Sequence, residues 1–387
     1  MQPRDPIVVV GGGPVGLAFA LMLARRGVAS TVLDARTLES ATVDRRLLAL
    51  SRGTLDLLRP LIDLPPAMVA AIRSVNVSSA GQFGRALLDE RDGVGQPLGV
   101  TVRYGDLLKQ LAAACARDTR IRVGRPCRVL RTEQQHARVV LHLESAPVMQ
   151  AVLVVNAEGL PPPAPRGGPG TVDDVGLVAD GVVSGTEAGC AFERFTRDGP
   201  LALLPLPQAA TSEGRMMGMV WCMPAAQAQR RQLLPEDAFA GELQAALGAR
   251  NGRIVHVGAR SSYPLHQRTR AELAEHRIVH VGNAAQTVHP VAGQGLNLGM
   301  RDSAELADRL GHAQATDKDV LSAVAGYARA RRIDRAAIIA LTRRIPPLFA
   351  TRAAPIALGR SVALTALGVV PELRREFARL LMFGVRA

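Results

Sequence analysis

Aromatic side chains and lysine are scarce in this chain of 387 residues. Phe, Trp and Tyr make up 3% of it, and its only lysines are Lys109 and Lys318, so the formal net charge of +13 rests on arginine. Proteins that bind single-stranded nucleic acid combine basic grooves with aromatic residues on which the bases stack. The composition therefore argues against nucleic acid as a partner, and it favours attraction to an anionic membrane surface as a use of the charge.

Metal-binding cysteine patterns and long apolar runs are also lacking. The four cysteines, Cys115, Cys127, Cys190 and Cys222, have neither metal-ligand spacing nor a CxxC pair, which predicts reduced thiols and no metal site. No uninterrupted apolar stretch approaches the roughly 20 residues of a membrane-spanning helix. No charged-then-apolar leader precedes Ile7. We expect a cytoplasmic protein, either free or peripheral at the inner membrane surface.

A glycine-rich turn follows the first apolar run. Ile7–Val10 has the pattern of a buried parallel strand, and Gly11-x-Gly13-x-x-Gly16 then leads into an apolar helix over Leu17–Arg25. Gly11 permits a tight turn, Gly13 lets the backbone approach a pyrophosphate, and Gly16 lets helix and strand pack closely. The helix N-terminus offers free N–H groups to the anion. The turn alone is a weak signal of dinucleotide binding.

An acidic residue in register strengthens this signal. A second apolar strand, Ser30–Leu33, ends at Asp34, 18 residues after Gly16. A carboxylate in this place accepts hydrogen bonds from the ribose hydroxyls of adenosine. The sequence therefore predicts dinucleotide binding, with contacts from Gly11, Gly13, Pro14, Val15, Gly16, Asp34 and Ala35.

A second glycine-rich segment lies near residue 290. It follows a strand over Arg277–Val281 and leads into a helix that begins at Gly295 and runs toward Leu310. The N-terminus of this helix would face the N1 and C2 carbonyl edge of an isoalloxazine ring, where negative charge collects on reduction. Together the two segments predict one bound FAD. The late contacts are expected from Gly282, Asn283, Pro290, Gly293, Gly295, Leu296 and Asn297.

The order of patterns predicts an α/β fold with interleaved parts. We expect a Rossmann-like FAD-binding domain over residues 1–70, 101–170 and 271–312, a mixed-sheet substrate domain over residues 71–100 and 171–270, and a helical C-terminal region over residues 313–387. The proline-rich segment Leu160–Pro165 is expected to be a loop at a boundary between the lobes.

Motifs along nearly the whole chain match one known family. They are the GxGxxG with Asp34, the segment Asp44-x-Arg46-x-x-Ala49-Leu50-Ser51, Arg103 with its downstream leucines, the stretch from Gly282 to Asp302, and the segments Ala191–Pro205 and Ser262–Leu265. In these the chain resembles the FAD-dependent aromatic hydroxylases of the p-hydroxybenzoate hydroxylase fold. Within that family it is most similar to the ubiquinone-biosynthesis branch, in particular the enzymes that hydroxylate 2-polyprenyl-6-methoxyphenol.

The resemblance implies a reaction and its participants. NAD(P)H would reduce the FAD, O2 would add at the flavin C4a position, and an electron-rich phenol would attack the distal oxygen of that hydroperoxide. Implied partners are a lipid-like phenolic substrate and other quinone-biosynthesis enzymes, and implied FAD contacts include Arg46, Arg103 and Val129. Because water would let the hydroperoxide decay, we expect an apolar pocket. Its candidate walls, each of which could equally be a plain core residue, are Leu203, Met219, Trp221, Tyr263 and Pro290.

Two motifs depart from the wider family. Gly282-Asn283-Ala284-Ala285-Gln286 replaces Gly-Asp-Ala-Ala-His, a form similar to that of the polyprenyl-methoxyphenol enzymes, and Asn283 can still hydrogen-bond a ribityl or phosphate oxygen. Ala157-Glu158-Gly159 replaces Ala-Asp-Gly. Glu158 either supports docking of the nicotinamide cofactor or only caps a strand end.

The sequence leaves open the roles of His289 and of the C-terminal segment. His289 is the candidate acid–base residue, although a histidine before a proline in a turn is more often structural. Between Ala353 and Val385, apolar runs alternate with Arg360, Arg374, Arg375 and Arg379; this basic amphipathic pattern indicates either a membrane contact or a helix packed on its own domain. The chain could also be a flavoprotein dehydrogenase or reductase, or a non-catalytic FAD-binding component of a quinone-biosynthesis assembly.

Overall fold

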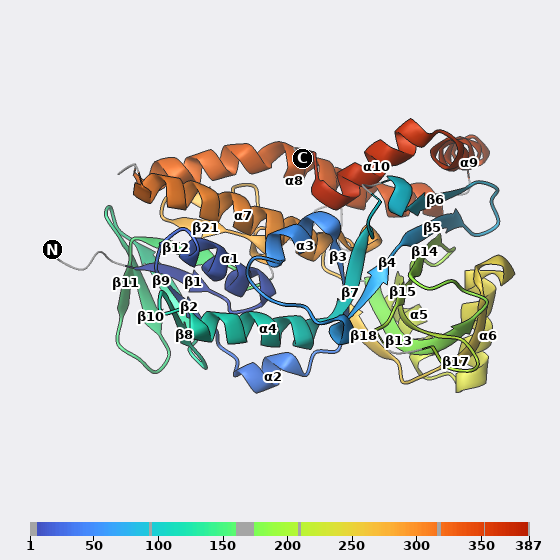
Figure 1. Ribbon diagram of the computed structural model, residues 1–387, viewed down its shortest axis with the longest axis horizontal. Coiled ribbons are helices and arrows are strands. Elements are labelled where there is room, and N and C mark those ends of the chain that lie inside the picture. Colours follow the sequence, from blue (N-terminus) through green and yellow to red (C-terminus); the bar gives the residue numbers. More distant parts are fainter. Residues whose placement is uncertain are drawn as a thin grey trace.

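A computed structural model describes residues 6–92, 95–159, 174–207, 210–315, 319–351 and 353–385. The expected loop over Leu160–Pro165 lies outside these residues. Two large sheets lie next to each other along the long axis of the molecule, and the C-terminal helices run along one side of both (Figure 1).

The first sheet is parallel apart from one edge strand. Its order is β20-β21-β12-β1-β2-β8, and only β20 runs antiparallel to its neighbour. The strands are β1 (Ile7–Val10), β2 (Ser30–Leu33), β8 (Ile121–Gly124), β12 (Leu153–Asn156), β20 (Ala274–Glu275) and β21 (Ile278–His280).

Both faces of this sheet are covered. Ile7 and Val9 of β1 pack into a core formed with helices on one face, whereas Val8 and Val10 pack on the opposite face against a small antiparallel sheet. Strands buried on both faces need an unbroken apolar sequence, which is why β1 is recognisable from its residues. The helices of the first face are α1 (Pro14–Ala24), α4 (Tyr104–Arg117) and α7 (Gln294–Ala315), and the small sheet contains β9 (Val129–Gln134), β10 (Val139–Leu143) and β11 (Met149–Ala151).

The second sheet is mixed and mostly antiparallel. Its order is β17-β13-β16-β15-β14-β5-β6, with β18 paired to β13, and only the β14–β5 pair is parallel. One face packs on α5 (Ala225–Gln232) and α6 (Glu236–Leu247) around a core that includes Trp221 and Phe239. The strands are β5 (Ser74–Ser79), β6 (Arg85–Asp89), β13 (Asp174–Ser184), β14 (Cys190–Phe195), β15 (Pro200–Pro205), β16 (Arg215–Pro224), β17 (Arg253–Val257) and β18 (Ser261–Pro264).

Short elements join the two sheets. A three-stranded sheet in the order β3-β7-β4 lies between them, and β19 (Arg268–Thr269) pairs with β22 (Gln286–Thr287). The segment Leu47–Ser51 forms the strand β3. The other joining elements are α2 (Leu38–Thr42), α3 (Arg52–Leu58), β4 (Val69–Ile72), β7 (Gly99–Arg103) and the 3-10 turns η1 (Pro66–Met68), η2 (Glu90–Asp92), η3 (Ala249–Asn251), η4 (Gly282–Ala284) and η5 (Val291–Gly293).

Three helices complete the chain: α8 (Val320–Ala350), α9 (Ala354–Val369) and α10 (Pro371–Phe383). Within the described residues no single helix has the length and apolar composition to cross a membrane; α9 and α10 together do, but they meet at a bend of 96°. The parallel sheet, the mixed second sheet and the helical C-terminal region confirm the α/β fold class predicted from the sequence.

Candidate FAD and substrate site

The first glycine turn joins β1 to α1 and has three different steric demands. Gly11 has a φ of +107°, and a Cβ there would lie 2.5 Å from the carbonyl group of Ala157. A Cβ on Gly16 would lie 1.9 Å from the Gly11 oxygen, so Gly16 is required by the packing of the protein itself. At Gly13 the nearest atom to a Cβ would be the Tyr104 hydroxyl, at 3.4 Å. Gly13 thus keeps open a space that the protein does not fill, as close approach of a pyrophosphate would require.

Asp34 directly follows β2 and lies beside this turn. Its side chain is 6% exposed, and it accepts hydrogen bonds from the backbone N–H groups of Gly12, at 2.7 Å, and Arg36, at 2.8 Å. The side-chain oxygens of Asp34 retain further acceptor capacity for ribose hydroxyls.

Arg125, which sequence reasoning missed, is a cation beside Asp34. It follows β8, the neighbour of β2, and its Nη2 lies 3.5 Å from an Asp34 oxygen and donates to the Gly12 carbonyl. Its Nε and Nη1 are buried without a partner among the described residues. Two unsatisfied donors beside the turn fit a ligand with phosphate or ribose oxygens. The sequence could have indicated Arg125, because it follows a strand and the carboxyl ends of adjacent parallel strands meet at one edge of a sheet.

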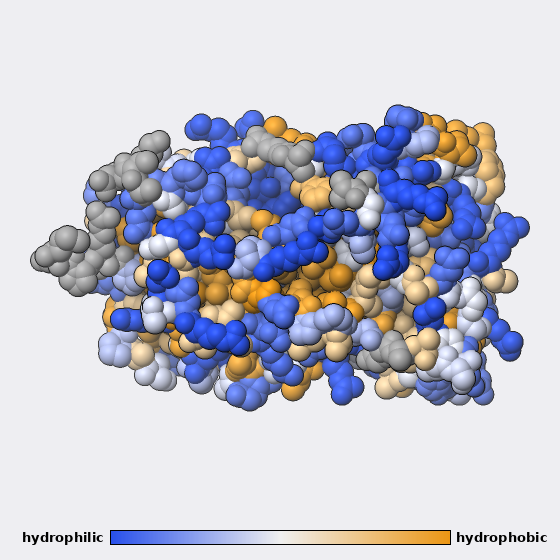
Figure 2. Space-filling model, viewed as in Figure 1, coloured by the Kyte–Doolittle hydropathy of each residue, from blue (hydrophilic) through white to orange (hydrophobic). Residues whose placement is uncertain are grey.

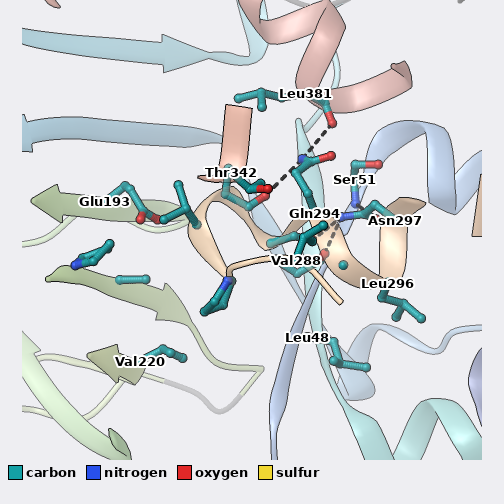
Figure 3. A pocket seen from close by; sticks show the side chains of 18 of the residues that line it. Leu48, Ser51, Glu193, Val220, Val288, Gln294, Leu296, Asn297, Thr342 and Leu381 are labelled. Carbon is teal, nitrogen blue, oxygen red and sulfur yellow. Dashed lines mark hydrogen bonds between the residues drawn. The ribbon is translucent and has the colours of Figure 1, made fainter. Parts of the chain in front are cut away.

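The second glycine segment is fixed by the Asn297 side chain, which is 1% exposed. Its Oδ1 accepts from the Ser51 N–H at 2.9 Å, and its Nδ2 donates to the carbonyls of Gly293, at 2.7 Å, and Ala49, at 3.0 Å. These bonds attach the start of α7 to β3 (Figure 3). The amide of Asn297 is therefore used in holding the loop, and the contact offered to a cofactor comes from the surrounding backbone.

The departure at Gln286 has a structural explanation. Its Nε2 donates to the fully buried carboxylate of Asp302 at 2.7 Å, and its Oε1 accepts from Arg335 Nε at 2.7 Å. Asp302 also accepts from Arg331 Nε at 2.8 Å. Gln286 thus hydrogen-bonds the Asp302 carboxylate of α7 and the Arg335 guanidinium of α8 at the same time. It lies behind the loop that carries Asn283.

A cavity of about 1080 Å³ connects the two glycine segments. At one end it is lined by Gly11, Asp34 and Asn283 and at its middle by Gly293, Gly295 and Leu296. From there it continues between the second sheet and the C-terminal helices as an arm lined mainly by apolar side chains, here called the apolar arm: Phe195, Leu341, Leu348, Leu364, Leu367 and Phe377.

A stacked aromatic pair helps to form this arm. The rings of Phe195 on β14 and Phe349 on α8 lie 3.7 Å apart between centroids and are inclined by 22°. Arg360 of α9 lies over Phe349, at 5.2 Å from the ring centroid, and donates to the carbonyls of Leu348, at 2.7 Å, and Phe349, at 3.0 Å. The buried guanidinium thus caps the last turn of α8, where its positive charge interacts favourably with the negative end of the helix dipole.

Comparison with known proteins assigns the chain to a family. A family model described as an FAD binding domain matches residues 4–159 and 175–336, which is more than half of the chain. The chain belongs to this FAD-binding family.

Relatives narrow this assignment to monooxygenases. Ubiquinone hydroxylase UbiL of Rhodospirillum rubrum is 30% identical over 96% of this chain and 88% of that protein. The 3-demethoxyubiquinol 3-hydroxylase of Escherichia coli is 27% identical over 81% of each. The crystal structure of p-nitrophenol 4-monooxygenase PnpA from Pseudomonas putida DLL-E4 has the same fold, with a TM-score of 0.74 at 18% identity over 100% of both chains. The prediction of an FAD-dependent monooxygenase related to the hydroxylases of ubiquinone biosynthesis is confirmed.

Most of the predicted FAD contacts of this monooxygenase lie in the cavity wall. Besides the residues already described, the structure brings Pro14, Val15, Ala35, Arg46 and Pro290 there. The Arg46 guanidinium lies between the rings of Tyr104, at 5.1 Å, and Tyr263, at 5.4 Å. Gly16 and Gly282 are one layer behind the wall: a Cβ on Gly282 would meet Val15 at 3.0 Å.

Two predicted contacts do not reach the cavity. Arg103 donates to the carbonyl of Arg45 at 2.9 Å and to Asp180 at 2.5 Å; it connects β7 to the second sheet instead of reaching a cofactor. Val129 opens β9 and packs with the core on the outer face of the first sheet. Both expectations came from family position, which does not specify the direction of a side chain.

Three predicted pocket walls are corrected by the structure. Leu203, Met219 and Trp221 belong to the core between the second sheet and helices α5 and α6. Because successive side chains of a strand point to opposite faces, their neighbours Ala202, Leu204, Val220 and Cys222 line the cavity. The apolar runs of β15 and β16 concealed this alternation in the sequence. Tyr263 and Pro290 do line the cavity.

His289 is placed as a structural residue. Its ring is 2% exposed, and Nδ1 accepts from the N–H of Val291 at 3.3 Å. Burial lowers the pKa of His289 to about 4, so the ring is neutral near pH 7. The neighbours Val288 and Pro290 line the cavity, whereas His289 faces away from it.

Glu158 lies in the cavity wall after β12, and its N–H donates to Asn156 Oδ1 at 3.0 Å. Burial and the nearby Asp34 carboxylate raise the pKa of Glu158. A second acid next to Asp34 places negative charge at this end of the cavity. This is compatible with the ribose hydroxyl groups of a dinucleotide as ligands there.

Proposed function

We propose that this monooxygenase hydroxylates a polyprenylated methoxyphenol in ubiquinone biosynthesis, with NAD(P)H as reductant and O2 as co-substrate. The observation that carries the proposal is the apolar arm, which continues from the second glycine segment between β14 and the C-terminal helices. A cavity of this lining suits an isoprenoid chain, and it excludes the water that would divert oxygen chemistry. The names of the two curated relatives support the same pathway.

In this proposal the two glycine segments bind different parts of FAD. The turn at Gly13 with Asp34 and Arg125 would hold the adenosine and pyrophosphate part of FAD, and the backbone of Gly293–Leu296 would face the flavin ring. The bound flavin supplies the redox and oxygen chemistry. The protein residues orient the two reactants and keep water out.

We also propose a peripheral membrane contact, which the same arrangement supports. Leu364 and Leu367 of α9 line the apolar arm, whereas Leu358, Val362 and Val369 of the same helix are 56%, 54% and 69% exposed. Apolar side chains gather on the surface over α9, at the upper right of Figure 2. Arginines of α10 lie next in the sequence, including Arg375 and Arg379. An apolar helix face beside basic residues is suited to anionic lipid, from which a prenylated substrate would enter.

The reaction is tested with purified holoenzyme and a short-chain prenylated 2-methoxyphenol. We expect this phenol to stimulate consumption of NAD(P)H and O2 in equal amounts and to gain one oxygen atom, which mass spectrometry with labelled O2 detects. Reduction of an artificial acceptor with no need for O2 would identify a dehydrogenase or reductase. A protein that binds FAD but consumes neither co-substrate would be a non-catalytic component, and either result would overturn the proposal.

A further inference from the structure

Glu193 places a carboxyl group inside the substrate side of the cavity. It lies on β14, opposite Ala202 of β15 and Val77 of β5, and it lines the cavity from the same face of the sheet as Val220. Figure 3 shows its side chain extending from the strand toward the loop that leads into α7. The sequence motif that contains it supported the family resemblance, but the site prediction gave it no role.

No cation from the described part of the chain pairs with this acid. Among the residues that the structure describes, Glu193 forms no ion pair, and the polar group that influences its carboxyl group is the backbone N–H of Ala292. Arg194, the next residue, is directed away and donates to the Ala246 carbonyl and to Ser78. An enclosed carboxylate without a counter-ion is costly to the fold. Stability therefore does not account for an acid at this position.

The partner of Glu193 belongs to the loop that would face the flavin. Ala292 has a φ of +57°, in the left-handed region that residues with a Cβ rarely adopt, and it lies between Pro290 and Gly293. The carboxyl group thus lies at the boundary between the second glycine segment and the second sheet, with the Ala292 N–H nearby as a donor. One of its oxygens can accept from Ala292 while the other remains available to a ligand in the cavity.

We propose that Glu193 is the catalytic base that accepts the hydrogen bond of the phenolic hydroxyl and removes its proton during hydroxylation; this rests on the proposed function above. The phenolic O–H bond breaks, a new O–H bond forms on the carboxylate, and the electron pair remains on the phenol oxygen. That pair enriches the ring carbons that are attacked by electrophilic oxygen. When the ring becomes aromatic again, its displaced hydrogen leaves to water as a proton and Glu193 returns its own proton to the phenol oxygen.

The overall stoichiometry is then balanced without a further reactant. One atom of O2 enters the ring and the other leaves as water, while NAD(P)H supplies two electrons and a proton and the solvent supplies the second proton. Glu193 ends in the ionisation state in which it began. A base in this role works best when its pKa is near the working pH.

The surroundings of Glu193 support this role. Burial raises the pKa of Glu193 to about 7, against the lowering effect of the Ala292 N–H. Cys222 of β16 faces the same space, but burial raises the pKa of its thiol well above the usual range, so it is neutral. Ala202 of β15, Val77 of β5 and Thr342 of α8 carry no charge. From α9 the one charged wall residue is Arg360, whose guanidinium is engaged by the carbonyls that end α8.

The decisive experiment measures binding of a phenol to the oxidised holoenzyme between pH 6 and 8. The probe is the short-chain prenylated 2-methoxyphenol, its methyl ether is the matched ligand without an O–H donor, and the change in flavin absorbance reports binding. Ionisation of Glu193 over this range should tighten the phenol roughly tenfold and leave the ether unchanged. Glu193→Gln, which still accepts from Ala292, should abolish this dependence and lower kcat by about 10²–10⁴, while FAD affinity stays the same.

Two further variants make the result specific. Glu193→Asp should restore the pH dependence with a reduced kcat, because it replaces the acid at a longer distance. Glu187→Gln removes an exposed carboxylate from the loop before β14 and should behave as the unchanged protein. A pH-dependent affinity that persists in Glu193→Gln, or that appears equally with the ether, would overturn the role of Glu193 alone. Failure of the unchanged protein to bind or hydroxylate the phenol would overturn the proposed function and this inference together.

Discussion

The side-chain amide of Gln294 donates a hydrogen bond to the carbonyl oxygen of Leu381 at 3.1 Å, and a second one to the Ala292 carbonyl at 3.1 Å. Gln294 is the first residue of α7, and Leu381 lies in α10, 87 residues further along the chain. The bond therefore joins the second glycine segment to the C-terminal region (Figure 3). A substitution that moves α10 should therefore also move the loop that would face the flavin.

Removal of this connection should destabilise the protein and loosen its cofactor. Gln294→Met keeps the length of the side chain but leaves two partly buried carbonyls without this donor, which costs about 1 kcal/mol of unfolding free energy. Denaturant unfolding of the FAD-free protein measures this loss, and flavin release on dilution measures the effect on binding. Gln227→Met on the exposed surface of α5 is the control, and an equal effect in both variants would contradict the connection.

Substitutions at two glycines of the first turn should affect cofactor binding and folding separately. Gly13→Val places its side chain in space that the protein leaves open. The unfolding free energy of the FAD-free protein should therefore stay within about 1 kcal/mol of the parent value, while FAD retention is lost. Gly16→Ala meets the Gly11 oxygen at 1.9 Å and should reduce folding itself. Flavin content and unfolding are measured on both. A Gly13→Val protein that stays yellow would refute the placement of the pyrophosphate.

His289 should contribute to the pH dependence of stability. The folded protein keeps this ring neutral until the pH approaches about 4, whereas the unfolded chain protonates it near 6.5. Between these values the unfolded state binds more protons, so the unfolding free energy decreases as the pH falls. On going from pH 7.5 to 5.5, His289→Asn should lose about 1 kcal/mol less than the parent. Denaturant curves at both pH values measure this difference.

The same variant tests whether His289 takes part in the reaction. The Asn oxygen can accept from the Val291 N–H in place of Nδ1, so the loop should keep its shape. We expect turnover with bound FAD to change by less than about tenfold. A decrease in turnover of more than about 10²-fold, the effect of losing an acid–base group, would show that His289 is catalytic.

The exposed face of α9 should carry the membrane contact. Leu358→Glu with Val362→Glu puts two charges on this face and should reduce flotation with vesicles that contain anionic lipid. Leu233→Glu with Val255→Glu, at exposed positions of the substrate lobe, is the matched control and should float as the parent does. Unchanged flotation of the α9 variant would remove the proposed contact.

Local patterns indicated the glycine turn and the acid that line one end of the cavity. The unbroken apolar run of β1, the spacing of Gly11, Gly13 and Gly16 and the acid at Asp34 each reflect a steric or hydrogen-bonding demand within a few residues. The same reasoning missed Arg125, since it did not consider which strands become neighbours in the sheet. It also assigned Leu203, Met219 and Trp221 to the wrong face, because β15 and β16 are apolar on both faces and their residues give no alternation from which to choose.

The sequence by itself determined that the chain binds a dinucleotide and belongs to the flavin hydroxylases, because glycines at turns and apolar runs in strands satisfy local requirements that few other residues meet. Only the tertiary structure decided which side chains enter the cavity. The meeting of Glu193 with Ala292 and of Gln294 with Leu381 depends on how two sheets and the C-terminal helices pack, and no spacing along the chain encodes those distances. The chemistry of the substrate side is therefore set by long-range packing, and that of the cofactor side by local motifs.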